Sequence, residues 1–331
     1  MRSFADLPAR IEALAREHER FAVVLLDAFG WAFVQRHADH PLLRRLQIEP
    51  VASQFPSTTT AHLTTLYTGL PVEQHGLYEW RVYEPAAGAV IRPLPWLPAG
   101  DDDPPLTIDP RDVLPPQRFF AGATVLHPQA IAGSRYGSVA LAGANIVPFE
   151  TIEEGAERLN DARGLTYLYW DRIDAVGHKH GPSSAAFDHT ARRALDALAR
   201  VETPMLVTAD HGQIDVSVTD DLDQSWPDLT RHLKLPPAGS ARDLFLHVDD
   251  PATVITELTE ALGDRARVLA AAELFDNAGP RLRERLADVC VLPAPGRMVA
   301  ISTFPSHERQ FKGHHGGLTP EESQTWIGLT A

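Results

Sequence analysis

The chain has 331 residues, of which 44% are hydrophobic and 22% are charged, and its formal net charge is -14. This length allows one large α/β domain or two smaller ones with a sizeable buried core. The excess of acidic residues, with no long basic run to balance it, excludes a general binder of nucleic-acid polymers or of anionic membrane surfaces.

The N-terminal residues, the apolar stretches and the cysteine content indicate the cellular compartment. Residues 1–20 are charged and amphipathic and lack the apolar core of a signal peptide. No stretch approaches about twenty apolar residues, so no membrane-spanning helix is predicted. The single cysteine, Cys290, cannot form an internal disulfide, and its apolar neighbours predict a buried strand thiol. We therefore expect a cytoplasmic protein.

The chain begins with a predicted amphipathic helix at residues 8–20, followed by the run FAVVLLDAFG at 21–30. Six apolar residues before Asp27 are typical of a strand that is buried on both faces. In open α/β sheets, groups at the carboxyl ends of strands line the binding crevice. A lone Asp at this position could also merely cap the next helix. A short helix is predicted at residues 42–46.

Residues 54–83 form the stretch around which we expect the chain to be organised. Phe55-Pro56-Ser57 precedes three threonines and indicates a helix start, and Thr68-Gly69 indicates its end. A threonine at a helix start lies where free backbone N–H groups and the helix dipole favour an anion. Taken alone, N-capping is the more common explanation of such threonines.

Strands and helices alternate through the rest of the chain. Residues 84–116 are rich in proline, and we expect an excursion with little regular structure there. Strands are predicted at 121–126, 138–142, 165–171, 204–210, 243–248, 288–292 and 298–302, and helices at 151–162, 183–200 with Ser183 as cap, 252–262 and 271–275. This alternation predicts an α/β fold with a central, mostly parallel sheet and helices on both faces. We expect one catalytic domain over residues 1–331, with a small subdomain at about 216–305.

Carboxylates and histidines gather where the predicted strands end. Three strands each lead to an Asp, two of these Asp have a His close behind, and a further His lies in a glycine-rich turn. The set consists of Asp27, Asp174, His178, Asp210, His211 and His315. Three Asp and three His at expected loop positions form a mixed ligand set that suits Zn²⁺, with Mn²⁺ or Fe as alternatives. Gly177, between Asp174 and His178, is expected to let the chain turn tightly.

The motifs and their order along the chain resemble those of the type I phosphodiesterase/nucleotide pyrophosphatase family of the alkaline phosphatase superfamily. The resemblance covers residues 23 to about 322. The most specific match is D-x-x-G-H-x-x-G-P at residues 174–182. The others are the Asp that ends the first strand, a Thr nine residues before a T-G, the D-H-G at 210–212 and the H-G at 315–316. The resemblance implies an alkaline-phosphatase-like fold.

The resemblance also implies a two-metal phosphohydrolase. One divalent ion would be held by Asp174, His178 and His315, and the other by Asp27, Asp210, His211 and the hydroxyl of Thr59. Two cations roughly 4 Å apart can stabilise the attacking and leaving oxygens of an in-line displacement at phosphorus. Because coordination activates a hydroxyl, Thr59 is the expected nucleophile and would form a covalent phosphothreonine. His314 is the main rival of His315 as a ligand.

The chain departs from the family members that bind nucleotides, which have Phe directly after the nucleophile and Asn three residues after it. Thr60 and His62 stand at these positions. His62 is expected to donate a hydrogen bond to a phosphoryl oxygen, whereas base stacking beside Thr60 is not implied. Tyr169 matches a tyrosine that family members use near the leaving group, although packing in the core would explain it equally well.

The expected function is hydrolysis of a small-molecule phosphodiester. Residues 51–79 contain no Arg or Lys, so a dianionic monoester would lack an extra cation beside Thr59 unless Arg81 or Arg135 folds back. The alternatives are a phosphomonoesterase or a phosphonoacetate-type hydrolase of the same superfamily and, from a different class, a non-catalytic metal-binding domain. The oligomeric state stays open.

Overall fold

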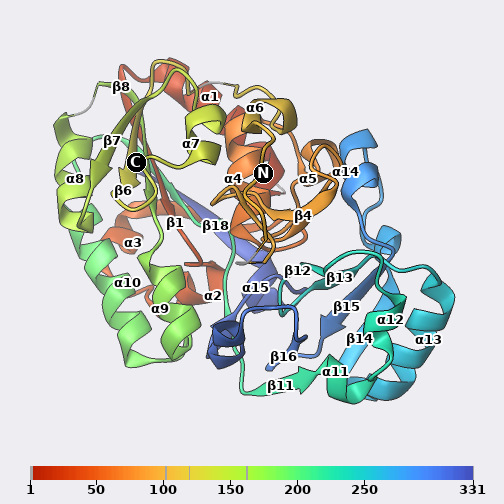
Figure 1. Ribbon diagram of the computed structural model, residues 1–331. Coiled ribbons are helices and arrows are strands. Elements are labelled where there is room, and N and C mark those ends of the chain that lie inside the picture. Colours follow the sequence, from red (N-terminus) through yellow and green to blue (C-terminus); the bar gives the residue numbers. More distant parts are fainter. Residues whose placement is uncertain (1–2, 101–102, 119, 162, 331) are drawn as a thin grey trace.

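A seven-stranded sheet lies at the centre of the computed structural model, within the described residues 3–100, 103–118, 120–161 and 163–330 (Figure 1). Its strand order is β2-β18-β9-β1-β8-β6-β7. The strands are β1 (Arg20–Leu26), β2 (Leu46–Ala52), β6 (Thr124–Pro128), β7 (Asn145–Phe149), β8 (Gly164–Trp170), β9 (Met205–Thr208) and β18 (Gln324–Thr330). The five strands from β9 to β7 are parallel to one another, and only β18 pairs antiparallel, with β9 and with β2.

Both faces of this sheet are covered by helices. Alternate residues of a strand point to opposite faces, so a strand with apolar residues at every position contributes to a core on each side. Ala22, Val24 and Leu26 of β1 belong to one core, and Phe21, Val23 and Leu25 to the other. The first core contains α2 (Trp31–Arg36), α3 (Pro41–Arg45), α8 (Ile152–Asp161), α9 (Arg172–His180) and α10 (Ala185–Leu198). The second contains α1 (Leu7–Glu17), α4 (Thr59–Thr68), α6 (Pro110–Val113) and α7 (Arg135–Ala140). The predicted α/β fold is therefore confirmed.

A second sheet, of order β12-β13-β15-β14, forms a lobe beside the central one (Figure 1). Its strands are β12 (Ala238–Gly239), β13 (Leu244–Leu246), β14 (Ala266–Ala270) and β15 (Val289–Pro293), and α13 (Pro251–Leu262) packs against it. Cys290 is buried in β15, as the sequence predicted. A further apolar cluster joins Phe245 and Cys290 of this lobe to Ala61 of α4. We propose that the chain is one domain that carries this lobe, at about residues 216–305, as a subdomain.

Short elements complete the chain. Two-stranded ladders pair β10 (Ile214–Asp215) with β17 (Gly313–His314), and β11 (Val218–Asp221) with β16 (Arg297–Ala300). The short helices are α5 (Val72–His75), α11 (Leu222–Ser225), α12 (Leu229–His232), α14 (Pro280–Arg285) and α15 (Pro320–Ser323), with 3-10 turns at Phe4–Asp6, Gly263–Arg265, Ala271–Leu274 and Ser306–Gln310. Among the helices of the described residues, none combines the length and apolar character that crossing a bilayer requires.

Three local predictions need correction. Residues 138–142 are not a strand, because Ser134 caps α7 by accepting a hydrogen bond from the Gly137 N–H at 3.0 Å. The excursion at 84–116 is more regular than predicted, since β3 (Val82–Glu84), β4 (Ala89–Arg92) and β5 (Leu97–Pro98) form an antiparallel sheet, although most of its other described residues lie in turns and loops. Residues 101 and 102 lie outside the described part. The cap of α10 is Ser184, whose hydroxyl accepts from the Phe187 N–H, and not Ser183. Residue 162, the predicted end of α8, also lies outside the described part.

Candidate active site

The three predicted acidic ligands, Asp27, Asp174 and Asp210, lie together because the strands that lead to them are neighbours in the sheet. Asp27 directly follows β1, and Asp210 lies two residues after β9, its parallel neighbour. Asp174 lies on α9, which begins just after β8, the other parallel neighbour of β1. The carboxyl ends of parallel strands meet at one edge of a sheet, so all three side chains reach the same region.

Asp174 and His178 lie on helix α9 and not in a loop, which corrects the sequence-based prediction. Their spacing of four residues places both side chains on one face of the helix, and Asp174 Oδ1 lies 3.4 Å from His178 Nε2. Gly177 makes no tight turn. A Cβ at Gly177 would lie 1.8 Å from Oε1 of Gln213, so the glycine admits the Gln213 side chain against the helix.

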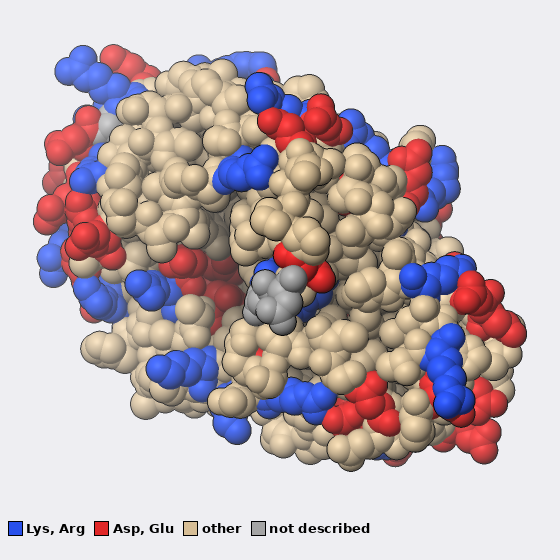
Figure 2. All heavy atoms as spheres, viewed as in Figure 1, with Lys and Arg blue, Asp and Glu red and all other residues tan. Residues whose placement is uncertain are grey.

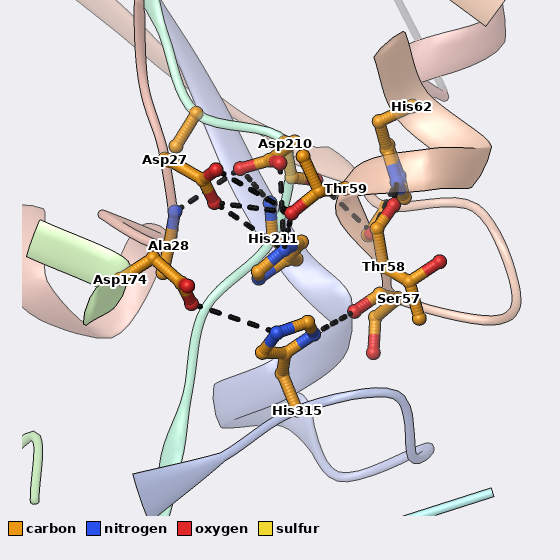
Figure 3. A network of polar contacts seen from close by, with 12 residues as sticks. Asp27, Ala28, Ser57, Thr58, Thr59, His62, Asp174, Asp210, His211 and His315 are labelled. Carbon is orange, nitrogen blue, oxygen red and sulfur yellow. Dashed lines mark hydrogen bonds and ion pairs between the residues drawn. The ribbon is translucent and has the colours of Figure 1, made fainter. Parts of the chain in front are cut away.

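Thr59 is the first residue of α4, and Thr58 before it is the extended N-cap. The Thr59 hydroxyl lies 3.3 and 3.4 Å from the two carboxylate oxygens of Asp27 and 3.2 Å from His211 Nε2 (Figure 3). The Thr58 hydroxyl instead donates to the carbonyl oxygen of Tyr78 at 3.1 Å. In the described structure, Thr59 is thus the member of the threonine run whose hydroxyl contacts the cluster of acidic and histidine side chains.

The three histidines share one orientation. Each directs Nδ1 to a backbone carbonyl oxygen: His178 to Gly313 at 2.9 Å, His211 to Gly212 at 3.0 Å and His315 to Ser57 at 2.9 Å. When Nδ1 carries the proton, Nε2 is left as a free lone pair, which is the arrangement of metal-binding histidines. His315 Nε2 lies 3.5 Å from Asp174 Oδ1 (Figure 3).

Two groups of side chains have their potential ligand atoms close enough to hold a metal ion. They are Asp27, Asp210 and His211, and Asp174, His211 and His315, with the ligand atoms of each group within 4.8 Å of one another. The first group, with Thr59 beside it, is one of the two predicted ligand sets. His178, a member of the other predicted set, contacts Asp174 but belongs to neither group. His314, the predicted rival of His315, is likewise in neither group.

The electrostatics of these side chains call for a cation. Burial, reinforced by Asp210 and Asp174, raises the pKa of Asp27 well above its usual value, and burial also raises the pKa of Asp174 and of Asp210. Burial lowers the pKa of His211 and of His315 well below its usual value. Oδ2 of Asp210 is buried and accepts no hydrogen bond from the described residues. Carboxylates this close and dry, with neutral imidazoles beside them, fit divalent metal ions.

The two predicted substrate contacts have different surroundings. The Tyr169 hydroxyl donates to Oδ2 of Asp27, so this tyrosine holds a candidate metal ligand in place while it lines the cavity described below. His62 is buried, its Nδ1 lies 2.7 Å from the Thr58 carbonyl oxygen, and its Nε2 accepts from the Gln54 N–H at 2.9 Å. Both ring nitrogens are engaged, so His62 has no N–H left for a phosphoryl oxygen, which corrects that prediction.

Sequence reasoning missed two residues that support the site. Gln213 donates to Oδ1 of Asp174 at 2.5 Å and to its backbone carbonyl at 3.2 Å. Ser57 offers the carbonyl oxygen that orients His315, and its own hydroxyl donates to the Gly317 carbonyl at 3.0 Å. Gln213 directly follows the D-H-G motif, but nothing in its sequence context indicates that it turns back to α9.

A cavity of about 880 Å³ opens over these groups. Figure 2 shows the hollow on this face, with acidic atoms on its floor and mostly uncharged residues around it. Its lining combines the site residues with apolar and aromatic side chains, among them Leu63, Tyr67, Trp80, Leu94, Ile131 and Tyr136. Among the described lining residues, Arg81 is the only Lys or Arg. The cavity could hold a small organic phosphoester with an apolar substituent.

A match to a protein family identifies the chain as a hydrolase of phosphoester bonds within the metal-dependent alkaline phosphatase superfamily. A sequence model of the type I phosphodiesterase / nucleotide pyrophosphatase family matches residues 21–96 and 134–318, most of the chain. The protein therefore belongs to that family, as the resemblance of its motifs implied.

Solved structures with a similar fold include two kinds of enzyme. An inactive threonine-to-alanine variant of murine ectonucleotide pyrophosphatase/phosphodiesterase 5, in complex with AMP, has a TM-score of 0.68 at 17% identity, over 94% of this chain and 88% of its own. Phosphonoacetate hydrolase from Sinorhizobium meliloti 1021, in complex with phosphonoformate, has a TM-score of 0.67 at 16% identity, over 94% of this chain and 89% of its own. At this identity, the similarity shows a shared fold.

Proposed function

We propose that the protein is a two-metal phosphodiesterase that acts on small-molecule diesters through Thr59. The observation that carries the proposal is the position of the Thr59 hydroxyl, at the start of α4 and within 3.4 Å of Asp27 and His211. A half-buried hydroxyl that faces the cavity among carboxylates and imidazoles has little structural purpose, whereas a nucleophile needs this surrounding. Membership of the type I phosphodiesterase family supports the same substrate class.

We assign the ligand sets that the family motifs imply, with His178 added to the second group because it contacts Asp174. Asp27, Asp210, His211 and Thr59 would hold one ion, and Asp174, His178 and His315 the other. Nitrogen and oxygen donors in this mixture suit Zn²⁺, with Mn²⁺ as the alternative. When bound, the two ions would compensate the buried carboxylates, lower the pKa of the Thr59 hydroxyl and offset charge on the phosphoryl group.

The chain's own groups then account for the chemistry. Thr59 is the first residue of α4, and the first N–H groups of a helix have no partner within the helix, so they would stabilise a phosphoryl oxygen there. The Thr59 hydroxyl, 3.3 Å from Oδ1 of Asp27, releases its proton to solvent, its oxygen attacks phosphorus, and the leaving alkoxide takes up a proton and departs as the alcohol. The resulting phosphothreonine is hydrolysed by water, which restores Thr59 and releases the monoester.

Phosphodiesters should be better substrates than phosphomonoesters. A monoester dianion needs an additional cation, and Arg81, the only Lys or Arg among the described lining residues, is already paired with Glu308. Arg135 contacts the carbonyl oxygen of Ile108 and is exposed. We expect kcat/KM on bis-p-nitrophenyl phosphate to exceed that on p-nitrophenyl phosphate by about tenfold or more at equal metal loading. A ratio that favours the monoester, or turnover of phosphonoacetate alone, would contradict the proposed substrate class.

Metal binding should depend on pH with a definite sign. Burial raises the pKa values of Asp27, Asp174 and Asp210 in the folded, metal-free chain. Between the ordinary carboxyl pKa and these raised values, the folded state holds protons that the unfolded state has released, so the free energy of unfolding falls as the pH rises. Bound divalent ions remove this cost. We therefore expect the increase in Tm on adding Zn²⁺ or Mn²⁺ to be larger at about pH 8 than at about pH 5.

The readout is the difference in Tm between metal-loaded and metal-free protein. The histidines act with the opposite sign, since their lowered pKa favours the folded state as the pH rises through about 6.5, their value in the unfolded chain. The histidines affect the stability of the unfolded reference equally in both samples. The difference in Tm therefore reports the contribution of the bound ions. An equal metal-induced shift at both pH values would contradict the assignment of buried carboxylates as ligands.

A further inference from the structure

The only cation in the described wall of the cavity is held by an acidic partner. Arg81 and Glu308 both line the cavity that contains Thr59. Nη2 of Arg81 lies 2.6 Å from Oε1 of Glu308, and Nη1 lies 3.2 Å from Oε2, so the pair is bidentate. The side chains are 2% and 13% exposed, and the guanidinium stacks over the ring of Phe304 at 4.2 Å.

Arg81 is tied to the nucleophile's helix. Three residues before it, the carbonyl oxygen of Tyr78 accepts the hydrogen bond from Thr58, the N-cap of α4. The Arg81 carbonyl oxygen accepts from the Gly239 N–H at 2.7 Å, which anchors the segment on its other side. Glu308 comes from a distant part of the chain, the 3-10 turn Ser306–Gln310. The guanidinium is therefore fixed in the cavity wall, and its partner belongs to a separate segment.

Glu308 is the acidic group that neutralises this guanidinium. Glu79 is nearer in sequence, but burial raises the pKa of Glu79 to about 8, so at neutral pH its carboxyl is largely uncharged. A guanidinium fork binds a carboxylate and a phosphate with the same paired geometry. With Glu308 in place, that fork is occupied. Without the charge of Glu308, a buried and uncompensated cation would face the cavity.

We propose that Glu308 is a specificity-determining residue that restricts the enzyme to phosphodiesters with a single negative charge. By occupying Arg81, it withholds the cation that a second anionic group would need, such as the additional charge of a monoester or the terminal phosphate of a nucleotide. The preferred substrates then carry an uncharged, apolar or aromatic second substituent, which suits the lining of the cavity. This inference rests on the proposed function and adds its charge selectivity.

The test compares the wild type with Glu308→Gln and with the double variant Arg81→Met/Glu308→Gln. Glutamine nearly matches glutamate in shape and can still accept from Arg81, so the fold should persist, and Tm checks this. In Glu308→Gln, the ratio of kcat/KM on p-nitrophenyl phosphate to that on bis-p-nitrophenyl phosphate should rise about tenfold or more. In the double variant, which has neither charge, the ratio should return toward that of the wild type.

A second readout is the inhibition constant of inorganic phosphate, which should fall about tenfold or more in Glu308→Gln and recover in the double variant. An unchanged ratio and an unchanged inhibition constant in a folded Glu308→Gln would overturn the inference, as would an equal gain in the double variant. If the single variant fails to fold, Arg81→Met replaces it. Arg81→Met leaves the Glu308 carboxylate without its cation at the cavity wall, so the ratio of kcat/KM on the monoester to that on the diester should fall below the wild-type value. An unchanged ratio in this variant would overturn the inference. Failure of the wild type to hydrolyse either diester or monoester would instead refute the proposed function.

Discussion

Thr59→Ala is expected to reduce kcat on a phosphodiester by about 10⁴-fold, as for other enzymes that lose their nucleophile. The Thr59 hydroxyl is the one of the threonine run that contacts both Asp27 and His211. Thr58, not Thr59, is the N-cap of α4, so the substitution removes no cap. We therefore expect the free energy of unfolding to change by less than about 1 kcal/mol. Steady-state kinetics with a Tm measurement separates lost chemistry from lost fold.

Two further variants complete this experiment. Thr59→Ser keeps a hydroxyl at the same position and should retain part of the activity. Thr60→Ala is the matched control, because Thr60 also lines the cavity but its hydroxyl makes no contact with Asp27 or His211 in the described structure. If Thr60→Ala were as inactive as Thr59→Ala, the nucleophile would be assigned to the wrong residue.

Removal of the metal ions should have an effect of similar size. The carboxylates and imidazoles of the candidate ligand groups are buried or half-buried. Among the described residues that line the cavity, Arg81 is the only Lys or Arg and is paired with Glu308, so the chemistry depends on bound cations. Chelation should therefore reduce activity to background, and Zn²⁺ or Mn²⁺ should restore it. Full turnover in a preparation shown to be metal-free would contradict the two-metal proposal.

Single variants should distinguish the two sites. His178→Ala removes a side chain that contacts Asp174, and we expect the metal content to fall from two ions per chain to one. His180→Ala is the matched control, because His180 lies on the same helix but is exposed. Elemental analysis of the purified variants measures both. An unchanged content in His178→Ala, or an equal loss in His180→Ala, would exclude His178 as a ligand.

The sequence predicted the strand ends well for a physical reason. A strand buried on both faces must be a continuous apolar run, so FAVVLL before Asp27 and MLVT before Asp210 marked the edge of a parallel sheet. The ordered motifs added Asp174 and His315. Strands β2, β7 and β18 of the central sheet were not predicted. Of these, β2 contains Glu49 and Pro50 and has a largely exposed pattern typical of an edge strand.

What the sequence could not predict depends on contacts between distant segments. Gly177 suggested a turn, but its role is to admit Gln213, which is evident only once the segment after β9 is placed against α9. His62 suggested a substrate contact, but Gln54 and Thr58 occupy its ring. The Arg81–Glu308 pair joins residues 227 positions apart. Patterns of burial report the local environment of a residue and not its partner.

The stereochemistry of the reaction tests the covalent role of Thr59 most directly. Each in-line displacement inverts the configuration at phosphorus, so attack by Thr59 followed by attack by water gives net retention. The measurement uses a phosphorothioate diester of known configuration, hydrolysed in isotopically labelled water, with the product's configuration determined afterwards. The account predicts retention. Inversion would contradict it, because a single displacement by water leaves no place for a phosphothreonine.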